Sequence, residues 1–234
     1  SASDKRIRAG HEAEEQMAFY LKRAFGDSKH VFVFNGLRIE RDGDSAQMDH
    51  VVLHPWGMFI IESKSLRASV RINKHGEWVR EWGDGQREGI DSPVQQALDQ
   101  ARLIRQVLND HKEVLLGKVL GLKQATFYGL PIGVRAAIAR GAIIEREGEN
   151  VPEVMKADMI STDLEREIKR HRQASGLLSK RDGDYGMYEL KDDEAKRIVE
   201  FLKSRHTPLA RPPRNNTSPS RVKPAPEAPA AAVP

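Results

Sequence analysis

The sequence contains no cysteine, which excludes disulfide bonds and zinc sites built from thiolates. It also has no run of about 18 apolar residues, the length that a membrane-spanning helix needs, and no secretory signal. A phosphate-binding Gly-Lys-Ser/Thr loop, a Gly-x-Ser-x-Gly elbow and a dinucleotide-binding glycine pattern are missing as well. These absences favour a cytoplasmic protein without a membrane segment that uses none of those catalytic schemes.

A strong charge of one sign is also missing. The net charge of +4 comes mostly from residues 207–234, which hold four basic residues and one acidic residue. Because the preceding 206 residues contain 34 basic and 33 acidic side chains, any surface that binds nucleic acid must be local. The terminal segment also holds eight of the twelve prolines, so we expect a disordered, basic Pro/Ala-rich linker there. Such a linker suggests that the chain is the N-terminal module of a longer protein.

The most informative segment is residues 46–64, which read AQMDHVVLHPWGMFIIESK. Two apolar runs flank the turn signal His-Pro-Trp-Gly, so the segment predicts a β-hairpin. Two registers are open. A loop of only Pro55 and Trp56 pairs His54 with Gly57, whereas a bulge with a left-handed Gly57 shifts the pairing by one residue.

Three ionisable residues define a candidate site in the tighter register. Asp49 then lies opposite Glu62, with the two Cβ atoms about 5 Å apart. Lys64 shares a strand face with Glu62 because it is two residues further along. Two carboxylates this close repel unless a proton or a metal joins them, and a hard divalent cation is the usual solution. In the bulged register the carboxylates lie on opposite faces, and a metal site then requires a compensating bulge. A structural salt bridge on a half-exposed hairpin is the alternative interpretation of Asp49, Glu62 and Lys64.

The spacing Asp-x12-Glu-x-Lys is the active-site pattern of the PD-(D/E)XK nucleases. The sequence around it resembles the nuclease-related (NERD) domain of that superfamily, in five segments that follow one another in the same order over residues 10 to about 112: Gly10–Glu15, Asn35–Leu37, Gln47–His50, Gly57–Lys64 and Ser92–Gln96. The resemblance implies an α/β fold with a restriction-endonuclease-like core in the order αβββαβ. We therefore expect a mixed central sheet flanked by helices, with extra helices towards the C-terminus.

The resemblance also implies a metal-dependent nuclease that hydrolyses DNA with Mg²⁺ or Mn²⁺. Asp49 and Glu62 would hold the metal, and Lys64 would orient water or stabilise charge on the phosphate. The remaining candidates are two metal ligands (Glu14 of the first helix and the backbone carbonyl of Ser63), a hydrogen-bonding glutamine (Gln96, with Gln95 as its alternative) and two phosphate contacts beside the site (His11 and His50).

Basic side chains of the following segment, Arg71, Lys74 and Arg80, predict a local wing that contacts phosphates. Trp78 and Trp82 lie on one strand face, where they either stack bases or pack the hairpin. NERD-like domains commonly precede a helicase, kinase or zinc-ribbon domain, which gives a possible partner in a longer DNA-processing or defence protein. Two alternatives remain open: a catalytically silent module that binds nucleic acid or protein, and a scaffold.

Residues 1–112 are expected to form the nuclease core, and residues 113–206 to complete the same domain ahead of the linker 207–234. Hydrophobic periodicity and end signals predict the secondary structure. The expected helices span residues 8–25, 92 to about 112, 161–173 and 192–205, the expected strands span 30–39 and 134–145, and a second hairpin spans 69–82. Residues 180–186 are expected to form a turn-rich connection.

Overall fold

The computed structural model describes residues 2–65, 69–119, 123–147, 151–175 and 188–208. The expected connection at 180–186 and residues 209–234 of the expected linker lie outside these ranges. No helix in the described part of the chain is long and apolar enough to cross a membrane.

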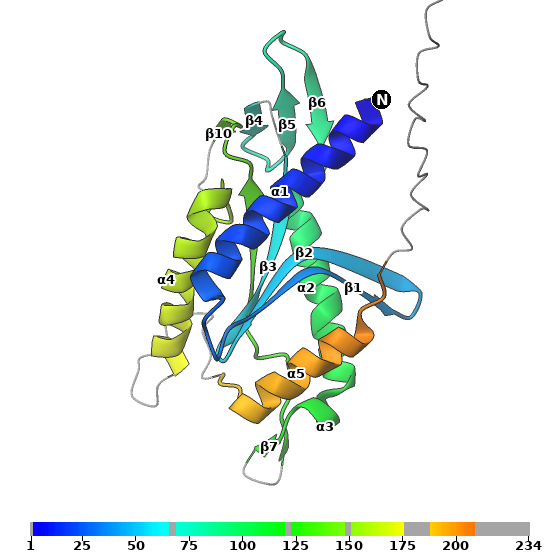
Figure 1. Cartoon of the computed structure of the whole chain (residues 1–234), viewed down its shortest axis with the longest axis vertical. Coiled ribbons are helices and arrows are strands. Elements are labelled where there is room, and N and C mark those ends of the chain that lie inside the picture. The colour runs from blue at the N-terminus through cyan, green and yellow to red at the C-terminus, as the bar shows by residue number, and fades with distance from the viewer. Residues whose placement is uncertain (1, 66–68, 120–122, 148–150, 176–187, 209–234) are drawn as a thin grey trace, which may run out of the picture.

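A five-stranded mixed sheet forms the centre of the molecule (Figure 1). Its strands, in spatial order, are β1 (Phe32–Arg41), β2 (Asp44–His54), β3 (Gly57–Lys64), β9 (Ile132–Ile138) and β11 (Val154–Lys156). The pairs β1–β2 and β2–β3 are antiparallel, whereas the pairs β3–β9 and β9–β11 are parallel. Parallel strands are buried on both faces, which explains the continuous apolar run of β3.

Helices cover both faces of this sheet. On one face α1 (Ala2–Phe25) and α4 (Ala157–Ser175) enclose a core that includes Met17, Leu21 and Phe59. On the other face α2 (Pro93–Asp110) and α5 (Asp192–Arg205) pack on a larger core, next to the short α3 (Lys112–Leu115). The order α1-β1-β2-β3-α2-β9 confirms the expected αβββαβ core, with helices on both faces of a mixed sheet.

A second, four-stranded sheet extends from the ends of β3 and β9 (Figure 1). It consists of β10 (Ile144–Arg146), β4 (Ser69–Ile72), β5 (Trp78–Glu81) and β6 (Arg87–Ile90). The expected second hairpin is therefore present as β4 and β5. The expectation of one strand over 134–145 was wrong, because a turn at Arg140–Gly141 divides it into β9 and β10, which belong to different sheets. A separate two-stranded ribbon is formed by β7 (Lys118–Val119) and β8 (Lys123–Gln124).

Helix starts follow the sequence signals unevenly. Ser92 caps α2 as predicted, since its Oγ accepts a hydrogen bond from the N–H of Gln95 at 3.2 Å. The predicted start of a helix at Ser161 was wrong, because α4 follows directly from β11 and begins at Ala157. The acidic residue in that signal, Asp163, lies inside the helix and binds Arg135 of β9.

Candidate active site

The β2–β3 hairpin adopts the tighter of the two registers. His54 pairs with Gly57 across the loop of Pro55 and Trp56, and pairing continues in the same register to His50 and Ile61. Gly57 is not left-handed, so the bulged alternative is excluded. A Cβ atom on Gly57 would lie 2.8 Å from the carbonyl oxygen of Pro131, which explains why the tight turn ends in glycine.

Asp49 lies just beyond the last ladder pair. Its Oδ2 accepts a hydrogen bond from the backbone N–H of Ser63 at 2.8 Å, so a carboxylate replaces the next backbone partner between the strands. The side chain is half-buried. Desolvation, together with the negative charges of Glu62 and Glu14, raises the pKa of Asp49 to about 7. The site therefore favours an added positive charge, whether a proton or a cation.

Glu62 is almost fully buried, with 3% of its surface exposed. Its Oε1 accepts a hydrogen bond from Lys64 Nζ at 2.8 Å, and its Oε2 accepts one from Gln100 Nε2 at 3.1 Å. Lys64 Nζ also donates to Gln96 Oε1 at 3.0 Å. The predicted carboxylate and ammonium therefore meet, and two glutamines of α2 hold them from the same side.

The structure distinguishes between the two glutamine candidates. Gln95 points along the helix surface, where its Nε2 donates to Asp99 Oδ1 at 3.1 Å, whereas Gln96 contacts Lys64. Gln100 was missed in the sequence. The available signal was its position four residues after Gln96, since residues four apart lie on the same face of a helix.

Residues 9–123 match the family profile of the nuclease-related domain, NERD. This stretch contains the whole cluster, from Glu14 to Gln100. These residues form a NERD domain. NERD is a PD-(D/E)XK-like nuclease domain, so the resemblance seen in the sequence is confirmed. No curated protein and no solved structure gives a significant match to the chain.

The NERD domain brings its first helix to the site from the opposite face of the sheet. Glu14 of α1 is partly exposed and lies 3.7 Å from His11 Nδ1, measured from its Oε2. Its charge is close enough to raise the pKa of Asp49. The expected helix acid therefore borders the site, with His11 beside it at the surface.

His50 does not take the position expected of a phosphate contact. Adjacent residues of a strand point to opposite faces, and His50 is only 1% exposed, with Nδ1 2.8 Å from Asn35 Oδ1. Desolvation lowers its pKa to about 4, so the ring is neutral at physiological pH. A buried, neutral imidazole is incompatible with the predicted contact to nucleic acid.

The oxygen atoms of the NERD site fit a hard divalent cation. Asp49, Glu62 and the backbone of Ser63 lie together, and carboxylate and carbonyl oxygens are the ligands that Mg²⁺ and Mn²⁺ prefer. Within the described ranges no three acidic or histidine side chains form a closed metal cage. That is compatible with Mg²⁺, which keeps several waters and often uses only one or two carboxylates.

The predicted phosphate-contacting wing consists largely of paired charges. Arg71 forms an ion pair with Glu147, and Arg80 lies 3.8 Å from Glu88, with its guanidinium 5.6 Å from the ring centre of Trp82. Trp78 is buried in the core beneath this sheet, so it packs the hairpin. Lys74 is exposed, and no ion pair involves it in the described part of the chain, so its contact with nucleic acid stays a prediction.

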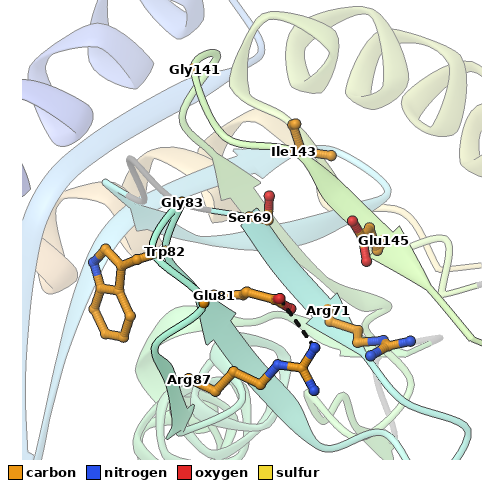
Figure 2. A pocket seen from close by; sticks show the side chains of 10 residues that line it. Ser69, Arg71, Glu81, Trp82, Gly83, Arg87, Gly141, Ile143 and Glu145 are labelled. Carbon is orange, nitrogen blue, oxygen red and sulfur yellow. Dashed lines mark hydrogen bonds and ion pairs between the residues drawn. The ribbon is translucent and has the colours of Figure 1, made fainter.

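A shallow cavity of about 590 Å³ lies on the outer face of the same small sheet (Figure 2). Arg71 and Arg87 line it, together with Glu81 and Glu145, and Arg87 donates to Glu81 at 3.1 Å. Its opposite charges are close to balance, unlike those around Asp49. The cavity therefore does not share the electrostatic character of the candidate site.

Proposed function

We propose that this NERD domain is a nuclease that hydrolyses phosphodiester bonds of DNA with Mg²⁺ or Mn²⁺. The observation that supports this most directly is the convergence of Asp49, Glu62 and Lys64 where β3 leaves the central sheet. The raised pKa of Asp49 adds support, because it reflects two acidic neighbours and burial that a bound cation would offset. A purely structural salt bridge would balance these charges instead.

In this proposal Asp49, Glu62 and the carbonyl of Ser63 hold the metal, with Glu14 contributing directly or through water. The metal supplies Lewis acidity, which polarises the scissile phosphate and lowers the pKa of water. Lys64 places an ammonium beside Glu62 and stabilises the charge that develops on the phosphate oxygens. Gln96 holds the Lys64 ammonium through its Oε1, which limits the directions in which this lysine can point.

DNA would cross the site where the small sheet begins, since β4 follows β3 after residues 65–68. Lys74 is the exposed basic candidate on that sheet, while Arg71 and Arg80 would have to exchange acidic partners for phosphates. We therefore expect Lys74 to contribute to affinity through its charge, as a phosphate contact does, without conferring sequence preference.

The test combines Mn²⁺ titration by calorimetry with cleavage of supercoiled plasmid. Asp49→Asn and Glu62→Gln should abolish Mn²⁺ binding, and these variants together with Lys64→Ala should reduce the cleavage rate by about 100-fold or more. Gln95→Ala is the matched control, because Gln95 lies on the same helix but contacts Asp99. This control should bind Mn²⁺ and cleave DNA as the wild type does.

Two results would contradict the proposal. Wild type that binds no Mn²⁺ would show that the carboxylates are not a metal site. Wild type that binds Mn²⁺ but leaves plasmid, linear and single-stranded DNA intact would favour a catalytically silent binding module.

A further inference from the structure

Gln100 connects the two strands that carry the candidate site. It projects from α2, is 5% exposed, and uses one nitrogen for two contacts. Its Nε2 donates to Glu62 Oε2 on β3 at 3.1 Å and to the carbonyl oxygen of Gln47 on β2 at 2.9 Å. Gln47 lies two residues before Asp49. One amide group therefore ties the Glu62 carboxylate to the strand that carries its acidic neighbour.

The orientation of this amide is determined by its neighbours. Both atoms facing its nitrogen are acceptors, so turning the amide over would place an oxygen against a carboxylate. In the observed orientation Oε1 is buried and has no hydrogen-bond partner in the described part of the chain. A buried acceptor without a donor is unfavourable for folding. The amide therefore donates to the Glu62 carboxylate and the Gln47 carbonyl while its own oxygen stays unpaired.

The contact with Gln100 limits the rotation of the Glu62 carboxylate. The terminal torsion of a glutamate is broad, so a carboxylate held at one oxygen can rotate about its last bond. Lys64 holds Oε1 and Gln100 holds Oε2, and the two contacts together fix the plane of the carboxylate. Each carboxylate oxygen has a second lone pair, which leaves both oxygens able to meet a cation.

We propose that Gln100 is a positioning residue for the metal site: it orients the Glu62 carboxylate towards Asp49 and thereby sets the affinity for the divalent cation. The inference rests on the proposed function, since it assigns Gln100 a role in the same site. Hydrogen-bond partners that orient a metal ligand typically change metal affinity by about 10- to 100-fold when removed. Gln100 acts through Glu62.

The test uses Gln100→Met in the full chain, because methionine matches glutamine in length and makes neither contact. Calorimetry without nucleic acid should show Mn²⁺ affinity reduced by about 10- to 100-fold. The Mn²⁺ concentration for half-maximal plasmid cleavage should rise by the same factor, with a smaller change in the rate at saturating Mn²⁺. Gln95→Met, the same substitution on the exposed side of α2, should change neither quantity.

The metal dependence separates positioning from a structural role. A structural defect lowers the melting temperature and the fraction of active protein, but it does not shift the Mn²⁺ concentration that the folded fraction requires. We expect Gln100→Met to melt within a few degrees of wild type. If it does not fold, Gln100→Asn, which is too short to reach both acceptors, should show the same shift in Mn²⁺ affinity. Failure of both variants to fold would overturn the inference in favour of a structural role.

The remaining outcomes distinguish this inference from the proposed function. Unchanged Mn²⁺ affinity in Gln100→Met, with an active wild type, would overturn the role of Gln100 and leave the nuclease proposal intact. Wild type that binds Mn²⁺ without cleaving DNA would remove the nuclease proposal, while the affinity of Gln100→Met would still decide the role of Gln100. Wild type that binds no Mn²⁺ would overturn both.

Discussion

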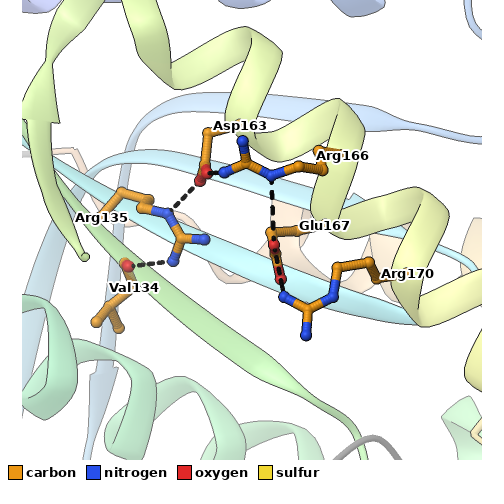
Figure 3. A network of polar contacts seen from close by, with 6 residues as sticks. All are labelled: Val134, Arg135, Asp163, Arg166, Glu167 and Arg170. Carbon is orange, nitrogen blue, oxygen red and sulfur yellow. Dashed lines mark hydrogen bonds and ion pairs between the residues drawn. The ribbon is translucent and has the colours of Figure 1, made fainter. Parts of the chain in front are cut away.

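Buried carboxylates occur on the two faces of the central sheet, but their surroundings differ. On the α4 face Asp163 accepts a hydrogen bond from Arg135 Nε at 2.6 Å and also pairs with Arg166, while Glu167 binds Arg170 at 3.0 Å (Figure 3). Two carboxylates there face three guanidinium groups. On the α2 face Glu62 accepts hydrogen bonds from the Lys64 ammonium and the Gln100 amide, whereas Asp49 accepts one from the neutral backbone N–H of Ser63.

The two clusters therefore differ in charge balance: guanidinium groups offset the carboxylates beside α4, whereas Asp49 and Glu62 together have one cationic neighbour, Lys64. A carboxylate paired with guanidinium groups keeps its charge because the partner offsets the loss of hydration. Asp49 has no guanidinium partner, so desolvation, together with the neighbouring charge of Glu62, raises its pKa to about 7. Substitutions that remove one carboxylate should therefore have opposite effects on stability at the two sites.

The largest effect is expected at the paired cluster. Asp163→Ala should destabilise the protein by about 3–5 kcal/mol, because it leaves the guanidinium of Arg135 buried without its carboxylate. Urea unfolding followed by circular dichroism measures this loss. Asp158→Ala on the same helix is the control, since its exposed pair with Arg140 should contribute at most about 1 kcal/mol. A similar loss of unfolding free energy in both variants would mean that the buried pair Arg135–Asp163 contributes no more than the exposed pair Arg140–Asp158.

The opposite sign is expected at the candidate metal site. The folded-state pKa of Asp49 lies above the ordinary aspartate value of 3.8, so its ionisation opposes folding increasingly as the pH rises from about 4 to about 7. Without metal, Asp49→Asn should therefore raise the free energy of unfolding by about 1–3 kcal/mol at pH 8, after allowance for partial exposure, and by little at pH 4.

Unfolding in urea at both pH values, with and without Mn²⁺, checks this prediction. Mn²⁺ should raise the free energy of unfolding of the wild type and leave that of Asp49→Asn unchanged. The stability advantage of the variant should therefore shrink or reverse when Mn²⁺ is present. A variant that is less stable than wild type at pH 8 without metal would show that Asp49 serves the fold.

The features that depend on residues close together in the sequence could be predicted from it. The hairpin and its turn were predicted, but two registers were left open; in the structure the loop of Pro55 and Trp56 sets the register that brings Asp49 beside Glu62. The ordered NERD segments gave the αβββαβ core. Gln96 was also identified as a candidate, and the structure places its Oε1 3.0 Å from Lys64 Nζ.

What the sequence did not reveal depends on contacts between distant segments. Gln100 resembles any polar residue on a helix until α2 is packed against β2 and β3. Asp163 resembles a helix cap until Arg135 is placed beside it. His50 resembles a site residue because it follows Asp49, yet the alternation of the strand buries it against Asn35.

The smallest effect is expected at His50. Burial lowers the pKa of this histidine, whereas it raises the pKa of the adjacent Asp49. Burial lowers the pKa of His50 from 6.5 to about 4, so below pH 6.5 the unfolded chain binds a proton that the folded chain does not. Stability should fall as the pH drops towards 4, by at most about 1.4 kcal/mol per pH unit for this histidine.

His50→Gln should remove that part of the slope, while its amide can still donate to Asn35. Urea unfolding at pH 6.5, 5.5 and 4.5 measures the free energy of unfolding of variant and wild type. The variant should gain stability relative to wild type at each lower pH. A difference that stays constant with pH would show that His50 is protonated in the folded protein, and that the strand face opposite Asp49 is open to water.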